Sequence, residues 1–274
     1  TNLCVGNNTV TITDALGCVT NADVTITQFN APTLAIAGTD ADCNGACDGS
    51  AVGTTTGGTA PFNYTWAHGP TNEDLNGVLC AGTYDLTVTD ANGCTDNASV
   101  TINEPPVITV NAPTTVDNTC NASCDGEVNV TAAGGTAPLS YEWFDGSGTS
   151  VGTTANVTGL CADTYDLTVT DGNGCTETST ATINEPPVLT VNGNSTPSNC
   201  GQADGSLTAN GAGGTPAYNY EWFSDAGLTT SVGTGQNLTN MAAGTYYVQV
   251  TDGNGCTADV SVTINDNSAG TLSS

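Results

Sequence analysis

Cysteine is the residue type in this sequence whose spacing most clearly predicts chemistry, because 12 of the 274 residues are cysteines. Two stretches carry four cysteines each at matching intervals, a later stretch carries two, and two more lie near the start. In chain order they are Cys4, Cys18, Cys43, Cys47, Cys80, Cys94, Cys120, Cys124, Cys161, Cys175, Cys200 and Cys256. Cysteines at repeating intervals are typical of disulfides formed in an oxidising compartment.

Two coupled losses in the third stretch predict one class of disulfide. Ala242 stands at the position of Cys80 and Cys161, and the Ala203–Asp204 segment lacks the second cysteine of the Cys-x-x-x-Cys pair. Residues that are lost together are expected to be partners. The predicted pairs are Cys47–Cys80 and Cys124–Cys161. Zinc binding by Cys-x-x-x-Cys is the competing interpretation, but it needs four convergent thiolates or imidazoles.

The first and fourth cysteines of each stretch form the other class, and the sequence leaves two pairings open. A disulfide needs Cα atoms within about 7 Å. A first-to-fourth bridge inside one stretch is strained. Together with the second-to-third bridge, it would have to span the hairpin strand that separates the third cysteine from the fourth. The two bridges and the segment that links the first two cysteines reach only about 26 Å. A staggered pairing between neighbouring stretches avoids the strain and leaves Cys94 and Cys200 with partners outside this sequence. The staggered pairs are Cys43–Cys175 and Cys120–Cys256.

The elements that position these cysteines recur along the chain. The motif Thr-Asp-x-x-Gly-Cys ends at Cys18, Cys94, Cys175 and Cys256. A Gly-Gly-Thr turn, a Tyr-x-Trp segment and a Tyr-x-Leu/Val-x-Val segment precede the last three copies in the same order. Internal repetition of this kind indicates tandem units. The predicted division is a partial repeat at 1–30 with only the last two strands of a unit, full repeats at 31–105, 106–186 and 187–266, and a tail at 267–274.

The apolar residues within a repeat recur with a period of two. Tyr84, Leu86 and Val88 share one face, and polar residues share the other, as in half-buried antiparallel strands. The Asp-x-Asn-Gly segments are hairpin turns in which glycine supplies the positive φ. The predicted fold class is all-β: tandem immunoglobulin-like β-sandwich repeats, stapled by disulfides. We expect them to be arranged as a rod, because paired prolines stiffen the junctions.

The charge of the chain excludes several partners. It has 27 acidic residues, one histidine (His68) and no lysine or arginine. Without basic residues it cannot neutralise phosphates, so neither nucleic acid nor an anionic membrane surface is an expected partner. The sequence has no uninterrupted window of about 18 apolar residues, so membrane insertion is not expected. We expect no enzyme activity, because the sequence has no nucleophile motif and no phosphate-binding loop.

The motifs of this chain resemble the SprB-type repeats of surface adhesins from Bacteroidota, with a more distant similarity to PKD-type immunoglobulin-like modules. The resemblance rests on Cys-Asn-Gly at Cys43, Gly-Gly-Thr-x-Pro, Tyr-x-Trp, the segment from Gly82 to Cys94, and Ile-Asn-Glu-Pro-Pro. It implies an extracellular or cell-surface location, export by the type IX secretion pathway, and a role in adhesion or gliding motility. The extra cysteine pairs and the lack of basic residues depart from the family pattern and leave open a surface filament of another kind.

Recurring acidic residues are the candidate metal ligands. One set is expected to converge at the junction of the first two full repeats, and the other at the next junction. The two sets are Asp48, Glu104 and Asp171, and Asp125, Glu185 and Asp252. Clusters of oxygen ligands suit Ca²⁺, which is the only cofactor that this sequence suggests. The alternative is that each aspartate caps its own turn.

Two functions remain open at this point. The first is a structural segment of an adhesin or filament that gives length and rigidity, with neighbouring repeats or copies of itself as partners. The second is an adhesion module that binds surface glycans or another cell, with or without calcium. The aromatic strand at Phe62, Tyr64 and Trp66 is its candidate stacking surface, although one tryptophan per sandwich is typical of core. The divergent segment at 223–236 is the other candidate.

The partial repeat raises a separate question. Cys4 and Cys18 correspond to the third and fourth cysteines of a repeat, so their expected partners lie upstream of Thr1. Either the array continues upstream in a longer chain, or a neighbouring subunit completes the sandwich by adding strands.

Overall fold

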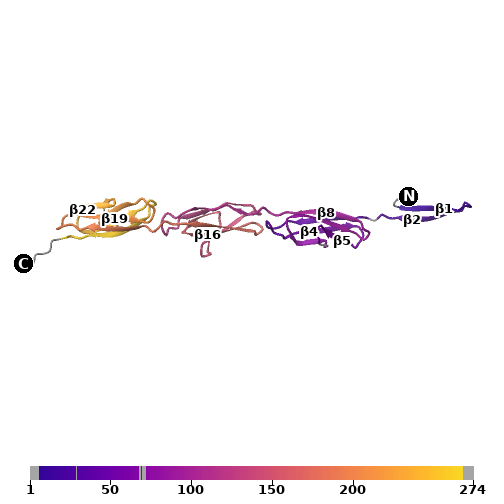
Figure 1. The fold of residues 1–274 in the computed structure, drawn as a ribbon, viewed down its shortest axis with the longest axis horizontal. Coiled ribbons are helices and arrows are strands. Elements are labelled where there is room, and N and C mark those ends of the chain that lie inside the picture. The colour runs from indigo at the N-terminus through magenta and orange to yellow at the C-terminus, as the bar shows by residue number, and fades with distance from the viewer. Residues whose placement is uncertain (1–5, 29, 68, 70–71, 268–274) are drawn as a thin grey trace, which may run out of the picture. The chain divides into compact units, whose positions relative to one another are not determined.

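The computed structural model describes residues 6–28, 30–67, 69 and 72–267. The chain divides into two compact units. The first comprises Thr1–Ile108 with Gly134–Ala137 and Gly172–Cys175, and the second comprises Thr109–Ala133, Pro138–Asp171 and Thr176–Ser274. All regular elements of the described residues are β-strands (Figure 1). The all-β prediction is confirmed.

The first unit contains three antiparallel sheets. A two-stranded hairpin pairs β1 (Gly6–Thr13) with β2 (Val19–Ile26). The second sheet has the order β3-β4-β6, and the third has the order β5-β7-β8. Their strands are β3 (Pro32–Thr39), β4 (Gly49–Gly57), β5 (Asn63–Trp66), β6 (Asp74–Leu79), β7 (Gly82–Thr89) and β8 (Thr95–Ile102).

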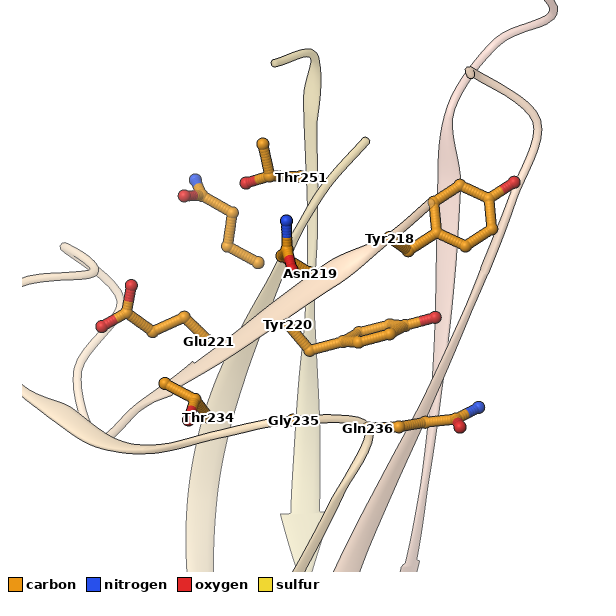
Figure 2. A pocket seen from close by; sticks show the side chains of 9 residues that line it. Tyr218, Asn219, Tyr220, Glu221, Thr234, Gly235, Gln236 and Thr251 are labelled. Carbon is orange, nitrogen blue, oxygen red and sulfur yellow. The ribbon is translucent and has the colours of Figure 1, made fainter. Parts of the chain in front are cut away.

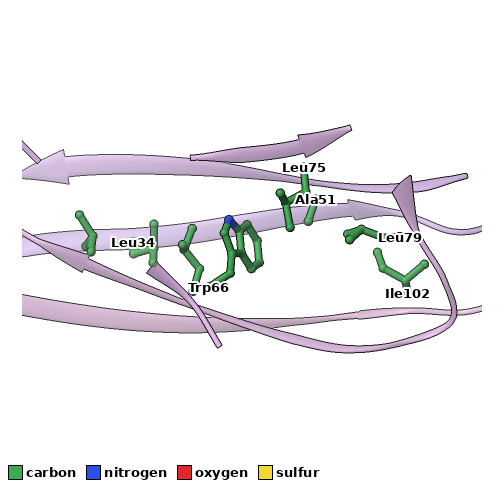
Figure 3. Packing of buried hydrophobic residues seen from close by; sticks show 8 residues of the cluster. Leu34, Ala51, Trp66, Leu75, Leu79 and Ile102 are labelled. Carbon is green, nitrogen blue, oxygen red and sulfur yellow. The ribbon is translucent and has the colours of Figure 1, made fainter. Parts of the chain in front are cut away.

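The two three-stranded sheets of the first unit enclose one hydrophobic core (Figure 3). Leu34 and Ala51 come from the β3-β4-β6 sheet, while Trp66, Leu86 and Ile102 come from the β5-β7-β8 sheet. Alternate residues of a strand point to the same face, so the period of two in the sequence puts these side chains inside. The result is the two-layer sandwich expected of an immunoglobulin-like repeat.

The second unit contains two further sandwiches. Their strands are β9 (Thr109–Val110), β10 (Thr114–Val116), β11 (Gly126–Asn129), β12 (Ala132–Ala133), β13 (Ser140–Phe144), β14 (Ser150–Gly152), β15 (Asn156–Leu160), β16 (Asp163–Thr170), β17 (Thr176–Ile183), β18 (Thr190–Thr196), β19 (Gly205–Ala212), β20 (Asn219–Phe223), β21 (Ser231–Thr234), β22 (Asn237–Met241), β23 (Gly244–Thr251) and β24 (Thr257–Ile264). The sheet orders are β10-β11-β15, β12-β9, β14-β13-β16-β17, β18-β19-β22 and β21-β20-β23-β24.

The repeats differ in how their opening strands are divided. In the middle repeat β9 pairs with β12 and β10 pairs with β11, so the opening strand contributes to two sheets. Pro113 lies between β9 and β10. It has no N–H to donate to a sheet ladder, which accounts for the interruption. The last repeat has seven strands and the described residues of the first full repeat form six, while the middle repeat is divided into nine shorter strands.

Each full repeat fixes its last hairpin with a tyrosine. The hydroxyl groups of Tyr84, Tyr165 and Tyr246 donate to the backbone carbonyl oxygens of the residues four positions earlier, at 3.0, 2.8 and 3.1 Å. This contact resembles the tyrosine corner of immunoglobulin-like sandwiches. It ties the start of the hairpin to the preceding crossover.

The β1–β2 hairpin has the sequence of such a closing hairpin, but among the described residues no sheet packs against it. Val10 and Ile12 are 48 % and 57 % exposed. Leu86 and Val88, which hold the same positions relative to the Thr-Asp-x-x-Gly-Cys motif, are 0 % exposed. The same apolar pattern is therefore core in one hairpin and surface in the other.

This contrast predicts different costs for one substitution at equivalent positions. Val248 is fully buried at the position that corresponds to Val10. Val248→Ala should lower the free energy of unfolding by about 2 kcal/mol, because two buried methyl groups are lost. Val10→Ala should change it by less than about 0.5 kcal/mol. Urea unfolding followed by tryptophan fluorescence measures both, and equal losses would contradict the assignment of Val10 to the surface.

Candidate functional site

Four disulfides connect eight of the cysteines. Two short ones, Cys47–Cys80 and Cys124–Cys161, have sequence separations of 33 and 37. Two long ones, Cys43–Cys175 and Cys120–Cys256, have sequence separations of 132 and 136, and each joins Cα atoms 5.8 Å apart. Of the two pairings that the sequence left open for the first and fourth cysteines, the structure contains the staggered one.

The cysteines without a disulfide fit the same staggered rule. Among the described residues they are Cys18, Cys94 and Cys200, and Cys4 lies outside the described part of the chain. Cys94 is a fourth cysteine without a first cysteine before it, and Cys200 is a first cysteine without a fourth cysteine after it. Cys200 also has a positive φ of 47°, in a loop one residue shorter than its counterparts.

An asparagine from the hairpin turn supports each long disulfide. The side-chain N–H of Asn173 donates to the carbonyl oxygen of Asp42 at 2.8 Å, beside Cys43. Asn254 donates to the carbonyl oxygen of Thr119 at 2.8 Å, beside Cys120. The Asp-x-Asn-Gly-Cys turn therefore contributes both a hydrogen bond and a sulfur atom to the preceding repeat.

The glutamates of the Ile-Asn-Glu-Pro-Pro segments hold the loops that carry the first cysteines. The carboxylate of Glu104 accepts hydrogen bonds from the Gly45 N–H at 2.7 Å and the Asn44 side chain at 3.0 Å. Glu185 accepts the equivalent bonds from Ala122 and Asn121 at 2.6 and 2.8 Å. Sequence reasoning treated these glutamates as metal ligands and missed this role. The only signal is their recurrence at the ends of the first two full repeats.

The recurring aspartate of the hairpin turn is a buried acceptor of backbone hydrogen bonds. Asp252 is 3 % exposed, and its carboxylate accepts the N–H groups of Thr215, Asn254 and Cys256 at 2.8, 2.9 and 2.9 Å. These donors stabilise the charged form, and the Thr215 N–H contributes most to lowering the pKa of Asp252. Asp90 accepts bonds from the corresponding N–H groups of its own repeat.

The aspartate after the second cysteine also caps its own loop. The carboxylate of Asp125 accepts hydrogen bonds from the Ser123 hydroxyl and from the hydroxyl and N–H of Thr119. These bonds, led by that of Ser123, lower the pKa of Asp125 to about 2. Asp48 accepts the equivalent N–H from Asp42 at 3.0 Å.

Five of the six predicted calcium ligands thus accept hydrogen bonds from N–H groups of nearby loops, and these are Asp48, Glu104, Asp125, Glu185 and Asp252. In the described ranges, no group of three or more His, Cys, Asp or Glu side chains has the arrangement to hold a metal ion. Asp48, Glu104 and Asp171, and likewise Asp125, Glu185 and Asp252, do not form such a group. The hydrogen bonds agree with the alternative that aspartates cap turns. Calcium binding stays a prediction.

The tryptophan of the aromatic strand in each repeat points into the core rather than into solvent. Trp66, Trp143 and Trp222 are at most 1 % exposed, and their indole N–H groups donate to backbone carbonyl oxygens. Phe62 and Tyr64 are partly buried against the same core. A stacking platform that includes the tryptophans is therefore wrong, because they are not accessible to a ligand. His68 lies outside the described residues.

The last repeat has a polar groove on the sheet that contains β20 (Figure 2). Its volume is about 610 Å³. The lining residues are Tyr218, Asn219, Tyr220, Glu221, Thr234, Gly235, Gln236, Gln249 and Thr251. Figure 2 shows the Tyr220 ring and the Gln236 side chain extending in the same direction, with Glu221 extending in the opposite direction. The divergent segment at 223–236 thus supplies one wall of the groove.

Comparison with protein families identifies the repeats. Residues 36–71 and 112–148 match the SprB repeat, and residues 186–266 match the Ig-like domain described as CHU_C associated. Together these matches cover more than half of the chain. It is a SprB-type Ig-like repeat protein. With its disulfides, this assignment indicates an extracellular surface protein.

Solved structures of tandem extracellular domains show distant similarity. The N-terminal eight Ig domains of Down Syndrome Cell Adhesion Molecule share 11 % identity at a TM-score of 0.38, with 95 % of this chain and 43 % of that chain covered. A tetra-tandem repeat from the extending region of a large adhesion protein shares 18 % identity at a TM-score of 0.27, covering 95 % and 82 %. Mouse Cadherin-23 EC22-24 shares 12 % identity at a TM-score of 0.31, covering 88 % and 100 %.

These similarities carry no information on function, because every TM-score is below 0.5. This chain spans less than half the length of the DSCAM chain. A search of curated proteins gave no significant match. The described residues include no helix with the length and apolar character needed to cross a membrane. The matched families are Ig-like repeats and not enzyme families.

The turn aspartate leads to a prediction about pH. Asp252→Asn should lower the melting temperature near neutral pH, because an amide has one acceptor oxygen and cannot accept both the Thr215 N–H and the N–H groups of Asn254 and Cys256. Since the pKa of Asp252 lies below its ordinary value of 3.8, the native protein has the full stabilisation above about that pH and loses it as the pH falls further. The difference between the two proteins should therefore shrink below pH 3.8. Thermal melts from pH 7 to pH 2 test this, with Asp259→Asn on the exposed strand face as the control. A difference independent of pH would contradict it.

Proposed function

We propose that this chain is a structural segment of an extracellular adhesin or cell-surface filament, which gives length and rigidity by linking successive repeats covalently. The single observation that carries the proposal is the pair of staggered disulfides, Cys43–Cys175 and Cys120–Cys256. Each joins the first cysteine of one repeat to the fourth cysteine of the next. The partners of a repeat are thus its own neighbours.

The hydrogen bonds around these disulfides support the same function. Glu104 and Glu185 hold the loops that present Cys43 and Cys120, and Asn173 and Asn254 approach those loops from the following repeat. A disulfide that closes a loop of more than 100 residues stabilises by about 5 kcal/mol in the chain-entropy model. Such a contribution is large for repeats of about 80 residues, whose burial alone leaves them marginal.

The resemblance to SprB-type adhesins extends the proposal. It leads us to propose export through the type IX secretion pathway and arrangement of the repeats as a rod. A role in gliding motility rests on the resemblance alone. The total lack of lysine and arginine supports a protein whose surface repels other acidic surfaces and remains soluble.

Single-molecule pulling tests the structural role. Replacing all four cysteines of the two long disulfides by serine should increase the maximum extension of the oxidised chain roughly twofold, since a stretched chain spans about 3.5 Å per residue. The matched control replaces the four cysteines of the short disulfides, whose loops of 33 and 37 residues should release much less length. Equal extensions for the native chain and the long-disulfide variant would refute covalent linkage between repeats.

A second candidate function is glycan binding in the groove of the last repeat. The groove combines amide, carboxylate and hydroxyl groups with two tyrosine side chains, which are the groups that commonly recognise sugars. Its Glu221 and the charge of the whole chain favour uncharged sugars over acidic ones. The groove would give the last repeat an adhesive role.

A panel of neutral oligosaccharides tests this candidate by NMR titration. Gln249→Ala should weaken any binding by up to about tenfold, because one hydrogen bond is worth about 1 kcal/mol. Gln202→Ala lies in the Cys200 loop outside the groove and should leave affinity unchanged. Equal effects of both substitutions, or no shift of groove resonances with any sugar, would eliminate the groove as a glycan site.

A further inference from the structure

Asn-Gly pairs are the places in this chain where spontaneous side-chain chemistry is expected. The backbone nitrogen of the glycine attacks the side-chain carbonyl carbon of the asparagine, because glycine has no side chain to obstruct the approach. The bond from that carbon to the amide nitrogen breaks, ammonia leaves with the proton of the attacking N–H, and a five-membered succinimide ring remains. Water then opens the ring, so that one amide and one water become one carboxylate, as aspartate or isoaspartate, and one ammonium ion. The sequence has seven such pairs, which begin at Asn44, Asn76, Asn92, Asn173, Asn192, Asn210 and Asn254.

Hydrogen bonds restrain four of these pairs, which lie in loops and turns. The Glu104 carboxylate accepts the Asn44 side chain at 3.0 Å and the N–H of Gly45, which is the attacking nitrogen, at 2.7 Å. In the three hairpin turns each asparagine side chain donates a hydrogen bond at 2.8 Å to a neighbouring loop, and these are Asn92, Asn173 and Asn254. Ring closure at these pairs is slowed, because it must first break such bonds.

Two further pairs lie within regular strands. Asn192 and Asn210 are opposite each other in the antiparallel ladder of β18 and β19. The N–H of Gly211 donates to the Tyr220 hydroxyl at 2.9 Å. Closing a five-membered ring requires the backbone to leave its extended conformation, and the hydrogen bonds of the ladder oppose that rotation.

The pair Asn76-Gly77 has none of these restraints. It lies in β6, at the edge of the β3-β4-β6 sheet, and both residues are exposed. The ladder with β4 includes Leu75 and Leu79 but no residue between them, so residues 76–78 bulge out of register. Gly77 has a positive φ of 64°, and a Cβ built on it would meet no atom within 4 Å. Among the described residues, nothing accepts a hydrogen bond from the Asn76 side chain.

We propose that Asn76 is a modification site of this chain, which deamidates spontaneously to aspartate or isoaspartate ahead of the other six pairs. The bulge gives the backbone room to rotate, and the exposure of the pair gives water access to the succinimide. The corresponding segments of the other full repeats carry Thr158–Gly159 and Thr239–Asn240, and neither contains an Asn-Gly pair. The inference is independent of the proposed structural role, because it makes no use of the long disulfides.

The reaction changes the backbone of β6 as well as its charge. Isoaspartate routes the main chain through the former side chain and adds one carbon atom between Leu75 and Leu79, which are 9 % and 5 % exposed. The next residue, Cys80, is bonded to Cys47, so the end of β6 stays attached to its repeat. The first full repeat should therefore lose stability as the modification accumulates, while the oxidised chain remains covalently intact.

The test follows deamidation in the full oxidised chain during incubation at mildly alkaline pH. Glutamyl endopeptidase, applied after reduction and alkylation, releases residues 74–104, a peptide that contains both Asn76 and Asn92. Tandem mass spectrometry then locates the gain of about one dalton that accompanies each conversion. Asn76 should convert at least about tenfold faster than Asn92, because Asn92 reacts only after two hydrogen bonds break. The same chain, reduced and unfolded in urea, should lose this difference.

Two variants separate the site from its surroundings. Asn76→Thr gives β6 the Thr-Gly pair of the middle repeat, and it should abolish both the conversion and the loss of stability on incubation. Thr59→Val removes the hydroxyl that accepts the Asn92 side chain, and it should speed conversion of Asn92 about fivefold while leaving Asn76 unchanged. Equal rates at Asn76 and Asn92 in the folded chain would overturn the proposal. So would an intact Asn76 in the folded chain after an incubation that converts it in urea.

Discussion

The covalent bond between one repeat and the next is the constraint on which this structure depends. A β-sandwich of about 80 residues buries little apolar area, and the core of each full repeat here is organised around a single tryptophan. The long disulfides compensate by restricting the unfolded chain over more than one repeat. They need accurate placement of two loops, and the repeated contacts of Glu104 and Glu185 and of Asn173 and Asn254 serve that placement.

Carboxylates do this work without any basic side chain. In a sequence with no lysine or arginine, hydrogen bonds from N–H and O–H groups take over the stabilisation of carboxylates that basic side chains commonly provide. The turn aspartates and the linker glutamates each accept several such bonds, often from backbone atoms of a loop that carries a cysteine. The acidic residues that look like a diffuse surface charge are in part structural acceptors with defined partners.

Much of the fold follows from the sequence, because the apolar period of the strands and the turn motifs are both local signals. The period of two around Leu86 and the Asp-x-Asn-Gly turns specify strands and hairpins, and the Gly-Gly-Thr and Tyr-x-Trp motifs recur in register. The long disulfide pairing does not follow from the sequence, because cysteine spacing limits the distance that a bridge can span but does not show which neighbouring loop approaches. The structure resolves it through the position of Cys175 next to Cys43.

The candidate sites were harder to anticipate than the fold. The role of Glu104 depends on a contact with Gly45, 59 residues earlier, which no local pattern encodes. The polar groove forms where Thr234 of β21 and Gln249 of β23 flank Glu221 on the two sides of β20, and of these elements only the divergent segment stands out in the sequence. Trp66 was recognised as core because one tryptophan per sandwich is a general property of the fold.

The overlap of the two long disulfides has a consequence for durability. Cys43–Cys175 and Cys120–Cys256 together bridge every peptide bond from residue 43 to residue 256. A single backbone cleavage anywhere in that span, whether by a protease or by chemical damage, leaves both fragments attached to each other. The two fragments separate only after a second break, either in the backbone or in a disulfide.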